Sequence, residues 1–152
     1  MAEAYAAAGN WEESRATYEH LLGRFPQGRF VSEAKFGAGL ALQKAKQFDR
    51  AVEAYQEVTR RTGSELAAKA QMQIGLCRAE QKRWEDAVKE LMVVPGTYDY
   101  ADVAASASLE AGKALVEMKE PAKAKDVLQR VVRDYSGTEW ATAAQKRLAE
   151  IQ

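Results

Sequence analysis

Residues 39–55, Gly-Leu-Ala-Leu-Gln-Lys-Ala-Lys-Gln-Phe-Asp-Arg-Ala-Val-Glu-Ala-Tyr, decide the fold of this chain. The stretch is typical of the inner turn of a helical hairpin, with small residues, Gly39 and Ala51, on the two helices and an aromatic residue, Phe48, between them. The same pattern recurs along the whole chain at steps of 36 or 37 residues. A period of roughly 20–50 residues indicates an array of stacked repeats.

Five positions recur in this register, and we call each set of equivalent residues a column. The glycine column is Ala2, Gly39, Gly75 and Gly112; the wedge column is Trp11, Phe48, Trp84 and Pro121; the alanine column is Ser14, Ala51, Ala87 and Ala124; the tyrosine–leucine column is Tyr18, Tyr55, Leu91 and Leu128; and the valine column is Leu21, Val58, Val94 and Val131. A glycine inside a helix costs about 1 kcal/mol relative to alanine. We therefore expect the glycine column to allow a close approach of the alanine column on the paired helix, and the wedge column to fill the turn between the helices.

Helix formers and helix-ending residues divide the chain into about nine helices. We expect the sixth helix to stop before Pro95, because proline disfavours helical backbone at the residue before it. The predicted fold class is all-α, an α-solenoid of stacked antiparallel helix hairpins in a single array over residues 1–152. Its expected units are residues 1–28, 29–64, 65–101 and 102–137, followed by a capping helix over residues 138–152 with a polar outer face.

Composition excludes several functional classes. The 152 residues carry 22 basic and 22 acidic side chains, so no net basic surface points to nucleic acid. No apolar run approaches the roughly 18 residues of a membrane-spanning helix, which predicts no direct membrane insertion. Met1 falls within the first repeat, so we expect the chain to begin inside a helix, as an excised fragment would, with any targeting segment removed.

Residues with catalytic chemistry are few, and none forms a recognisable site. The single histidine, His20, has no metal-ligand partner one helical turn away and is expected to face solvent. The single cysteine, Cys77, has no activating histidine and is expected to be a small buried residue. No glycine-rich phosphate loop is present. We therefore predict no enzyme activity, no catalytic residues, no metal and no cofactor.

The columns resemble the tetratricopeptide repeat family, whose signature is a small residue, an alanine twelve positions later and an aromatic residue four further on. Gly39, Ala51 and Tyr55 match this signature, and the third and fourth units match it more loosely. The steps of 36–37 residues exceed the common 34, and we expect the surplus at the turns between units. The aromatic residues of those turns, around Phe25, Tyr98 and Tyr135, are similar to those of bacterial envelope members, the outer-membrane assembly lipoprotein and the Tol–Pal coordinating protein. That likeness implies a bacterial and periplasmic origin, with the cytoplasm as the alternative.

The resemblance also implies where a partner would bind. In this family the first helix of each unit lines a concave surface that receives peptides or proteins. The matching positions here are Phe36, Leu40, Gln43, Lys44, Lys69, Met72, Leu76, Glu80, Leu109, Lys113, Val116 and Glu117. The mixture of aliphatic side chains with both charges suits an amphipathic helix or an extended segment.

Other interpretations stay open from the sequence. These twelve residues could instead cover the seams between helices. The array could be a structural spacer, or a self-association module that uses its end helices within a larger envelope protein. A related class of helical repeats reads single-stranded RNA, but the balanced charge and the glycine and alanine columns disfavour it.

Overall fold

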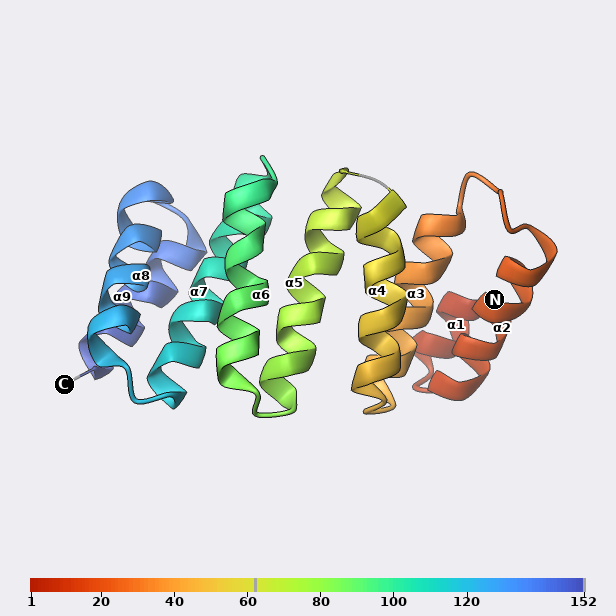
Figure 1. The fold of residues 1–152 in the computed structure, drawn as a ribbon, viewed down its shortest axis with the longest axis horizontal. Helices are drawn as coiled ribbons and strands as arrows, with labels where there is room; N and C mark the ends of the chain where they lie inside the picture. The colour runs from red at the N-terminus through yellow and green to blue at the C-terminus, as the bar shows by residue number, and fades with distance from the viewer. Residues whose placement is uncertain (62, 152) are drawn as a thin grey trace.

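A computed structural model describes residues 1–61 and 63–151 of the chain. Within these residues it contains nine α-helices and no strands, which follow one another as antiparallel pairs in a single row (Figure 1). They are α1 (Ala2–Ala7), α2 (Trp11–Arg24), α3 (Val31–Lys44), α4 (Phe48–Arg61), α5 (Glu65–Glu80), α6 (Trp84–Thr97), α7 (Ala101–Glu117), α8 (Pro121–Asp134) and α9 (Glu139–Glu150). The predicted all-α solenoid of helix hairpins is confirmed. Thr62 and Gln152, expected in a turn and in the capping helix, lie outside the described residues.

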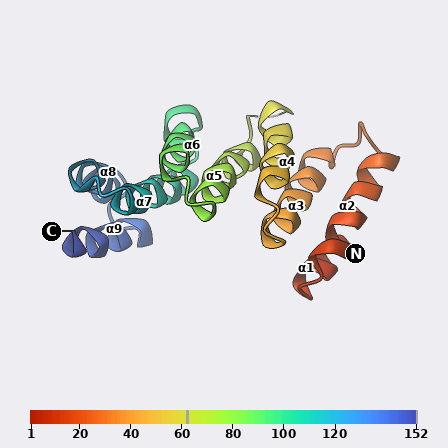
Figure 2. The ribbon, with the colours of Figure 1, turned by 60° about the horizontal axis from the view of Figure 1, so that its bottom comes forward.

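Helices pack against their neighbours along the row, and the first helices of successive pairs also touch one another. The contacts join α3 to α5, α5 to α7 and α7 to α9. Figure 2 shows the consequence: α4, α6 and α8 lie along one side of the row, and α3, α5, α7 and α9 lie along the other. We call the surface formed by α1, α3, α5, α7 and α9 the first-helix face.

The glycine column does allow a close approach, but its partner differs from the expected one. A Cβ atom added to Gly112 would lie 2.5 Å from Cδ2 of Leu128, and one on Gly75 would lie 2.5 Å from Cγ of Leu91. A Cβ on Gly39 would lie 2.7 Å from the ring of Tyr55. The glycines therefore receive the tyrosine–leucine column, because these larger side chains reach across the hairpin. The alanine column is fully buried nearby but does not make this contact.

The wedge column is not the buried filler that we expected. Trp11, Phe48 and Trp84 are only half-buried, and Pro121 is exposed. Each begins a second helix, and Phe48 packs against the core cluster around Tyr55 while it stays partly exposed. Removing one of them should therefore cost less than the roughly 3–5 kcal/mol typical of a well-buried aromatic.

The expectation that α6 ends before Pro95 is wrong. The helix continues through Pro95 to Thr97 and has the same length, 14 residues, as α2, α4 and α8. Pro95 removes only its own N–H from the helix ladder near the end of α6, and the N–H of Tyr98 still donates to the carbonyl of Val94 at 3.0 Å. Burial of Leu91 and Val94 on the preceding turn holds the backbone helical.

The surplus residues of the longer repeats lie mainly within helices and not in the turns between units. The first helices α5 and α7 have 16 and 17 residues, compared with 14 in α3. The connection from α6 to α7 is short, spanning residues 98–100, whereas residues 25–30 make a longer turn between α2 and α3. The extra residues of α5 and α7 extend their N-terminal halves.

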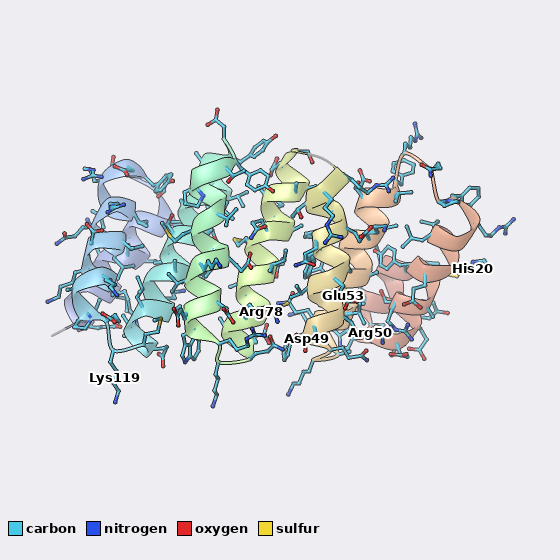
Figure 3. The ribbon with its side chains drawn as sticks, in the orientation of Figure 1. His20, Asp49, Arg50, Glu53, Arg78 and Lys119 are labelled. Atoms are coloured by element: carbon cyan, nitrogen blue, oxygen red, sulfur yellow. The ribbon has the colours of Figure 1, made fainter. Side chains whose placement is uncertain are left out.

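Each hairpin turn contains one residue with left-handed backbone. These residues fall in one register: Gly9, Lys46, Lys82 and Lys119, with φ of 79°, 60°, 60° and 59°. At the α3–α4 turn, the N–H of Lys46 donates to the carbonyl of Gln43 at 2.9 Å, and the N–H of Gln47 donates to that of Leu42 at 2.8 Å. This pattern satisfies the last carbonyls of α3 and ends the helix. Figure 3 shows Lys119 projecting from the corresponding end of the α7–α8 hairpin.

Candidate binding face

A groove crosses the first-helix face at its N-terminal end. It encloses about 380 Å³ between α1, α2 and α3, and it reaches α5 at Leu66. Trp11 and Tyr18 from α2 face Phe36 and Leu40 from α3 across its apolar floor. Its rim is charged, with Glu3, Glu33 and Lys44. We call this hollow the N-terminal groove.

Gly37 gives the N-terminal groove its shape. A Cβ atom on Gly37 would lie 2.3 Å from Cζ of Tyr18, so the absence of a side chain at Gly37 leaves room for the ring of Tyr18 against α3. Burial raises the pKa of the Tyr18 phenol, and the carboxylate of Glu3 adds to the shift. The sequence columns missed Gly37 because it has no counterpart in the other units. The pair of glycines in the Phe36–Gly39 stretch was the one available signal.

A hydrogen-bonded chain links the second and third units in the middle of the face. The hydroxyl of Tyr55 donates to Oε1 of Gln43 at 2.8 Å, and Nε2 of Gln43 donates to Oε1 of Glu80 at 3.1 Å. Gln43 is only 9% exposed. Its amide therefore serves to join α3, α4 and α5, and it is less available to a partner than we expected.

A second groove of about 260 Å³ lies between α5, α6, α7 and α9. Leu76, Trp84 and Ala114 line its apolar part, and its rim includes the charged groups of Lys113 and Glu117. The ammonium group of Lys113 bonds to Glu110 at 2.7 Å. The guanidinium group of Arg147, from α9, lies 3.9 Å from Glu117 and 2.9 Å from Glu150. We call this hollow the C-terminal groove.

The structure therefore distributes the twelve predicted residues unevenly. Phe36, Leu40 and Lys44 line the N-terminal groove, and Leu76, Lys113 and Glu117 line the C-terminal groove. Gln43 and Glu80 form the hydrogen-bonded link described above. The other four lie apart from both grooves: Lys69 is exposed and pairs with Glu65, Met72 packs on a core cluster, Leu109 is buried, and Val116 lines a separate hollow beside Pro121 and Ile151.

Leu109 is the clearest misplacement among the twelve. It is 6% exposed and belongs to the core formed with Leu128, Val131 and Ala144. At this depth its side chain fills the seam between α7, α8 and α9, as the alternative interpretation anticipated. Among the positions that follow it in α7, Glu110, Lys113 and Glu117 are closer to the surface.

The opposite side of the row carries a hollow that the sequence did not indicate. It encloses about 450 Å³ and is lined mainly by charged side chains of α2 and α4, among them Arg50 and Glu53 (Figure 3). Much of that charge is already compensated, since Arg50 lies 3.7 Å from Glu19 and Glu57 accepts from Lys35 at 2.8 Å. The hydrogen bond from Lys35 is the main cause that holds the pKa of Glu57 below its ordinary value.

An ion pair also joins the second helix hairpin, α3–α4, to the third, α5–α6. The guanidinium group of Arg78 on α5 donates to Oδ1 of Asp49 on α4 at 2.9 Å, and Gln81 donates to the same oxygen at 3.2 Å (Figure 3). The bonds from Gln81 and Arg78 hold the pKa of Asp49 below its ordinary value. These contacts are structural, because they join adjacent helices at one edge of the row.

The two residues with potential catalytic chemistry, Cys77 and His20, lie in different environments. Cys77 is fully buried, and burial raises the pKa of its thiol to about 12, as suits the small core residue that we predicted. His20 is exposed on α2, also as predicted (Figure 3). Across residues 1–61 and 63–151, no three histidine, cysteine or acidic side chains gather in a way that could hold a metal ion. In the same residues, no helix combines the length and apolar character needed to cross a membrane.

Comparison with known proteins agrees with this architecture. Models of the tetratricopeptide repeat match residues 36–92 in one case and residues 1–28 and 106–138 in another. Together these matches span most of the chain, which therefore belongs to the tetratricopeptide repeat family. No curated protein matches the sequence.

Several solved structures superpose on nearly the whole chain. BtubC (BKLC) from P. vanneervenii matches with a TM-score of 0.80 at 13% identity, covering 99% of this chain and 68% of that one. Nearly identical TPR-like repeats of a putative kinesin light chain from Podosopora anserina match with a TM-score of 0.76 at 16% identity, covering 99% and 81%. MamA matches with a TM-score of 0.68 at 15% identity, covering 99% and 92%. At these identities the likeness concerns the fold alone.

Proposed function

We propose that this chain is a non-catalytic scaffold that binds a peptide or partner protein along the first-helix face. Tetratricopeptide repeats generally mediate protein–protein interaction, and this chain has the repeat architecture throughout. The observation that carries the proposal is the N-terminal groove, where Trp11, Tyr18, Phe36 and Leu40 form an apolar floor beneath a charged rim. Grooves of this composition suit apolar anchors on a helical or extended segment.

The arrangement of charge indicates how such a segment would lie. Glu3 and Glu33 are acidic groups on the rim of the N-terminal groove, and Lys44 is its basic group. The ligand would place its apolar anchor on the floor of the groove. A basic residue of the ligand would face the two glutamates, and an acidic residue of the ligand would face Lys44. Lys113 and Glu117 offer a second pair of charges at the C-terminal groove, although Lys113 already pairs with Glu110 of the same helix and Glu117 with Arg147 of α9.

A selection from a phage-displayed library of random peptides tests this placement. Selected peptides should lose most of their affinity for Leu40→Asp and for the double variant Lys44→Glu with Lys113→Glu. Glu53→Lys, in the charged hollow on the opposite side, is the matched control and should leave binding unchanged. Equal affinity for the Leu40→Asp protein and the parent would refute the placement on this face.

The alternative function, a structural spacer or a self-association module of a larger envelope protein, makes a different prediction. The exposed side of α9 is largely polar, with Thr142, Gln145 and Lys146, as suits the end of an array rather than an apolar stacking surface. Self-association would give a mass that rises with concentration in sedimentation, whereas the scaffold should keep a monomer mass that is independent of concentration. The bacterial envelope origin is supported by the aromatic turn pattern around Phe25, Tyr98 and Tyr135.

A further inference from the structure

A row of lysines lies along one edge of the molecule, at the turns inside the later hairpins. Lys46, Lys82 and Lys119 are the only residues other than glycine with left-handed backbone in the part of the chain that the structure describes. All three side chains are exposed. Their turns, α3–α4, α5–α6 and α7–α8, lie along the same edge of the row of helices (Figure 1). We call these three residues the lysine row.

The backbone does not require lysine at these positions. Glycine adopts left-handed backbone without steric cost, and asparagine and aspartate adopt it more readily than other residues. The first unit has Gly9 at the equivalent turn, with φ of 79°. The chain therefore places lysine three times where glycine would be less strained, which points to a role of the side chain.

Helix capping explains only part of this choice. A basic side chain near the end of a helix interacts favourably with the last carbonyls and with the helix dipole. The last turns of α3 and α5 already contain Lys44 and Arg78, and among the three first helices only α7 has no basic residue there. The helix dipole therefore does not account for lysine at all three turns.

The ammonium groups of the lysine row are uncompensated. Among the described residues, their side chains form no hydrogen bond and no ion pair. Most acidic side chains beside them are already neutralised, in the pairs Asp49–Arg78 at 2.9 Å, Asp86–Arg83 at 2.6 Å and Glu120–Lys123 at 3.4 Å. Glu80 and Glu85 have no such pair within residues 1–61 and 63–151, but the lysine row and the unpaired Lys44 outnumber them. The edge therefore carries excess positive charge although the whole chain is neutral.

The spacing of the turns suits one extended polypeptide. Packed helices lie with their axes about 8–10 Å apart, so successive hairpin turns lie no more than about 20 Å apart and the three turns span about 40 Å. An extended polypeptide covers about 40 Å with twelve residues. Each lysine has a flexible four-carbon stem, so carboxylates on such a segment need no exact register with the turns.

Other polyanions fit this edge less well. A flat anionic membrane would meet Glu80 and Glu85 together with the lysines, whereas a single extended chain can follow the ammonium groups alone. Proteins that bind single-stranded nucleic acid combine a basic groove with aromatic side chains on which the bases stack. The aromatic residues nearest to the lysine row in sequence, Phe48 and Trp84, are half-buried. A line of unpaired lysines favours an acidic protein segment.

We propose that the lysine row is a second interaction site, which binds an acidic, extended segment of a partner protein along the edge of the array. The contact is electrostatic, between carboxylates of that segment and the ammonium groups of Lys46, Lys82 and Lys119. The site does not depend on a ligand in either groove, so its failure would leave the proposed scaffold function standing.

A fluorescent peptide of twelve glutamates is a defined probe. Its anisotropy at low salt should show saturable binding to the full chain, and the binding should weaken as salt is added. Because an exposed ion pair contributes a factor of about 1.5 to 5 in affinity, the triple variant Lys46→Asn, Lys82→Asn and Lys119→Asn should bind about tenfold more weakly. Asparagine tolerates left-handed backbone, so the triple variant should keep the thermal unfolding of the parent. The three single variants should each lose part of the affinity.

A matched control removes the same charge elsewhere. Arg29→Gln, Lys89→Gln and Lys146→Gln change three exposed basic residues that form no ion pair with any described residue and lie outside the turns of the lysine row. This control should bind the glutamate peptide almost as tightly as the parent. Equal losses in the two triple variants would assign binding to net charge and overturn the proposal.

Further comparisons separate the proposal from its competitors. A single-stranded oligonucleotide of twelve thymidines and vesicles that contain anionic lipid should both bind more weakly than the peptide, and tighter binding of either would overturn the choice of an acidic protein segment. Leu40→Asp, in the N-terminal groove, should leave binding of the peptide unchanged, and loss there would assign the peptide to the first-helix face. Absence of saturable binding by the parent, or undiminished binding by the lysine-to-asparagine variants, would also overturn the proposal.

Discussion

The first unit of the array and the later units carry the same sequence columns but bury them to different extents. Leu21 in the first unit is 41% exposed, whereas Val94 in the third has no exposed surface. In the third unit, Val94 belongs to one core cluster with Val103 and Ala104 from the 17-residue α7. A column thus determines which side of a helix faces the array, but packing of the neighbouring helix determines whether that side is buried.

The largest expected effect comes from truncating one leucine in each region. Leu91→Ala removes a fully buried side chain that packs on Gly75, and it should lower the free energy of unfolding by about 2–5 kcal/mol. Leu21→Ala should cost less than about 1 kcal/mol, because much of that side chain already contacts water. Urea denaturation of both variants measures the difference, and equal losses would contradict the comparison.

Alkaline titration tests the buried core that joins the second and third units. Burial raises the pKa of Cys77 from 9.0 to about 12, and it also raises the pKa of Tyr55 above its ordinary 10.0. Below pH 9 both groups are neutral whether the chain is folded or not, so their contribution is complete. Above pH 9 the unfolded chain ionises first, and stability should fall by up to about 1.4 kcal/mol per pH unit for each group until its folded pKa is reached.

Cys77→Ala separates the two groups in this titration. Its loss of stability should begin near pH 10, where the ordinary pKa of tyrosine lies, and not near pH 9. Denaturant midpoints measured at intervals between pH 8 and pH 11 give the onset. The same onset in the parent and in Cys77→Ala would argue against a thiol buried in this core.

Two glycines sharpen the contrast between packed and open positions. Gly112→Ala would place a Cβ atom 2.5 Å from Cδ2 of Leu128, and it should destabilise the chain by about 1–3 kcal/mol. Gly23→Ala, in α2 of the first unit, meets no atom within 4 Å and should stabilise the chain by up to about 1 kcal/mol through helix propensity alone. Opposite signs in thermal unfolding are expected, and a loss at both sites would refute the assignment of Gly23 to open space.

The smallest expected effect concerns the hairpin turns. Lys119 adopts left-handed backbone that Gly9 adopts in the first unit. Lys119→Gly should relieve that conformation and stabilise the chain by roughly 0.5–1 kcal/mol, less than the cost of the left-handed backbone because glycine is more flexible when unfolded. The converse variant, Gly9→Lys, should destabilise it by a similar amount, as measured by thermal unfolding.

Most of the fold could be predicted from the sequence, because helical periodicity and a repeated register both act over short distances. The described residues contain the nine helices that the sequence predicted, paired as the repeated columns indicated. The exception, the end of α6, depended on packing of Leu91 and Val94 that outweighed the local preference of Pro95. The partner of the glycine column was also misassigned, since side-chain reach across a hairpin cannot be read from spacing.

The candidate site was less predictable for the same reason. Mapping by position found Phe36, Leu40 and Lys44, which do line a groove, but it could not anticipate that Leu109 is buried between three helices. Trp11 was expected to fill the turn between two helices, whereas Trp11 and Tyr18 both line the floor of the N-terminal groove. Grooves arise where side chains of different helices leave space, and that space depends on tertiary packing.

Amide hydrogen exchange of the native chain tests most directly whether burial of the shared columns rises from the first unit to the later ones. Local opening free energies follow the coverage of each helix, so the amides of α5 and α7 should exchange most slowly and those of α2 much faster. Mass spectrometry of peptides from residues 11–24, 65–80 and 101–117 gives the three rates under one condition. Protection of α2 equal to that of α5 and α7 would contradict the account, because an open first unit could not then explain the exposed Leu21 and Phe25.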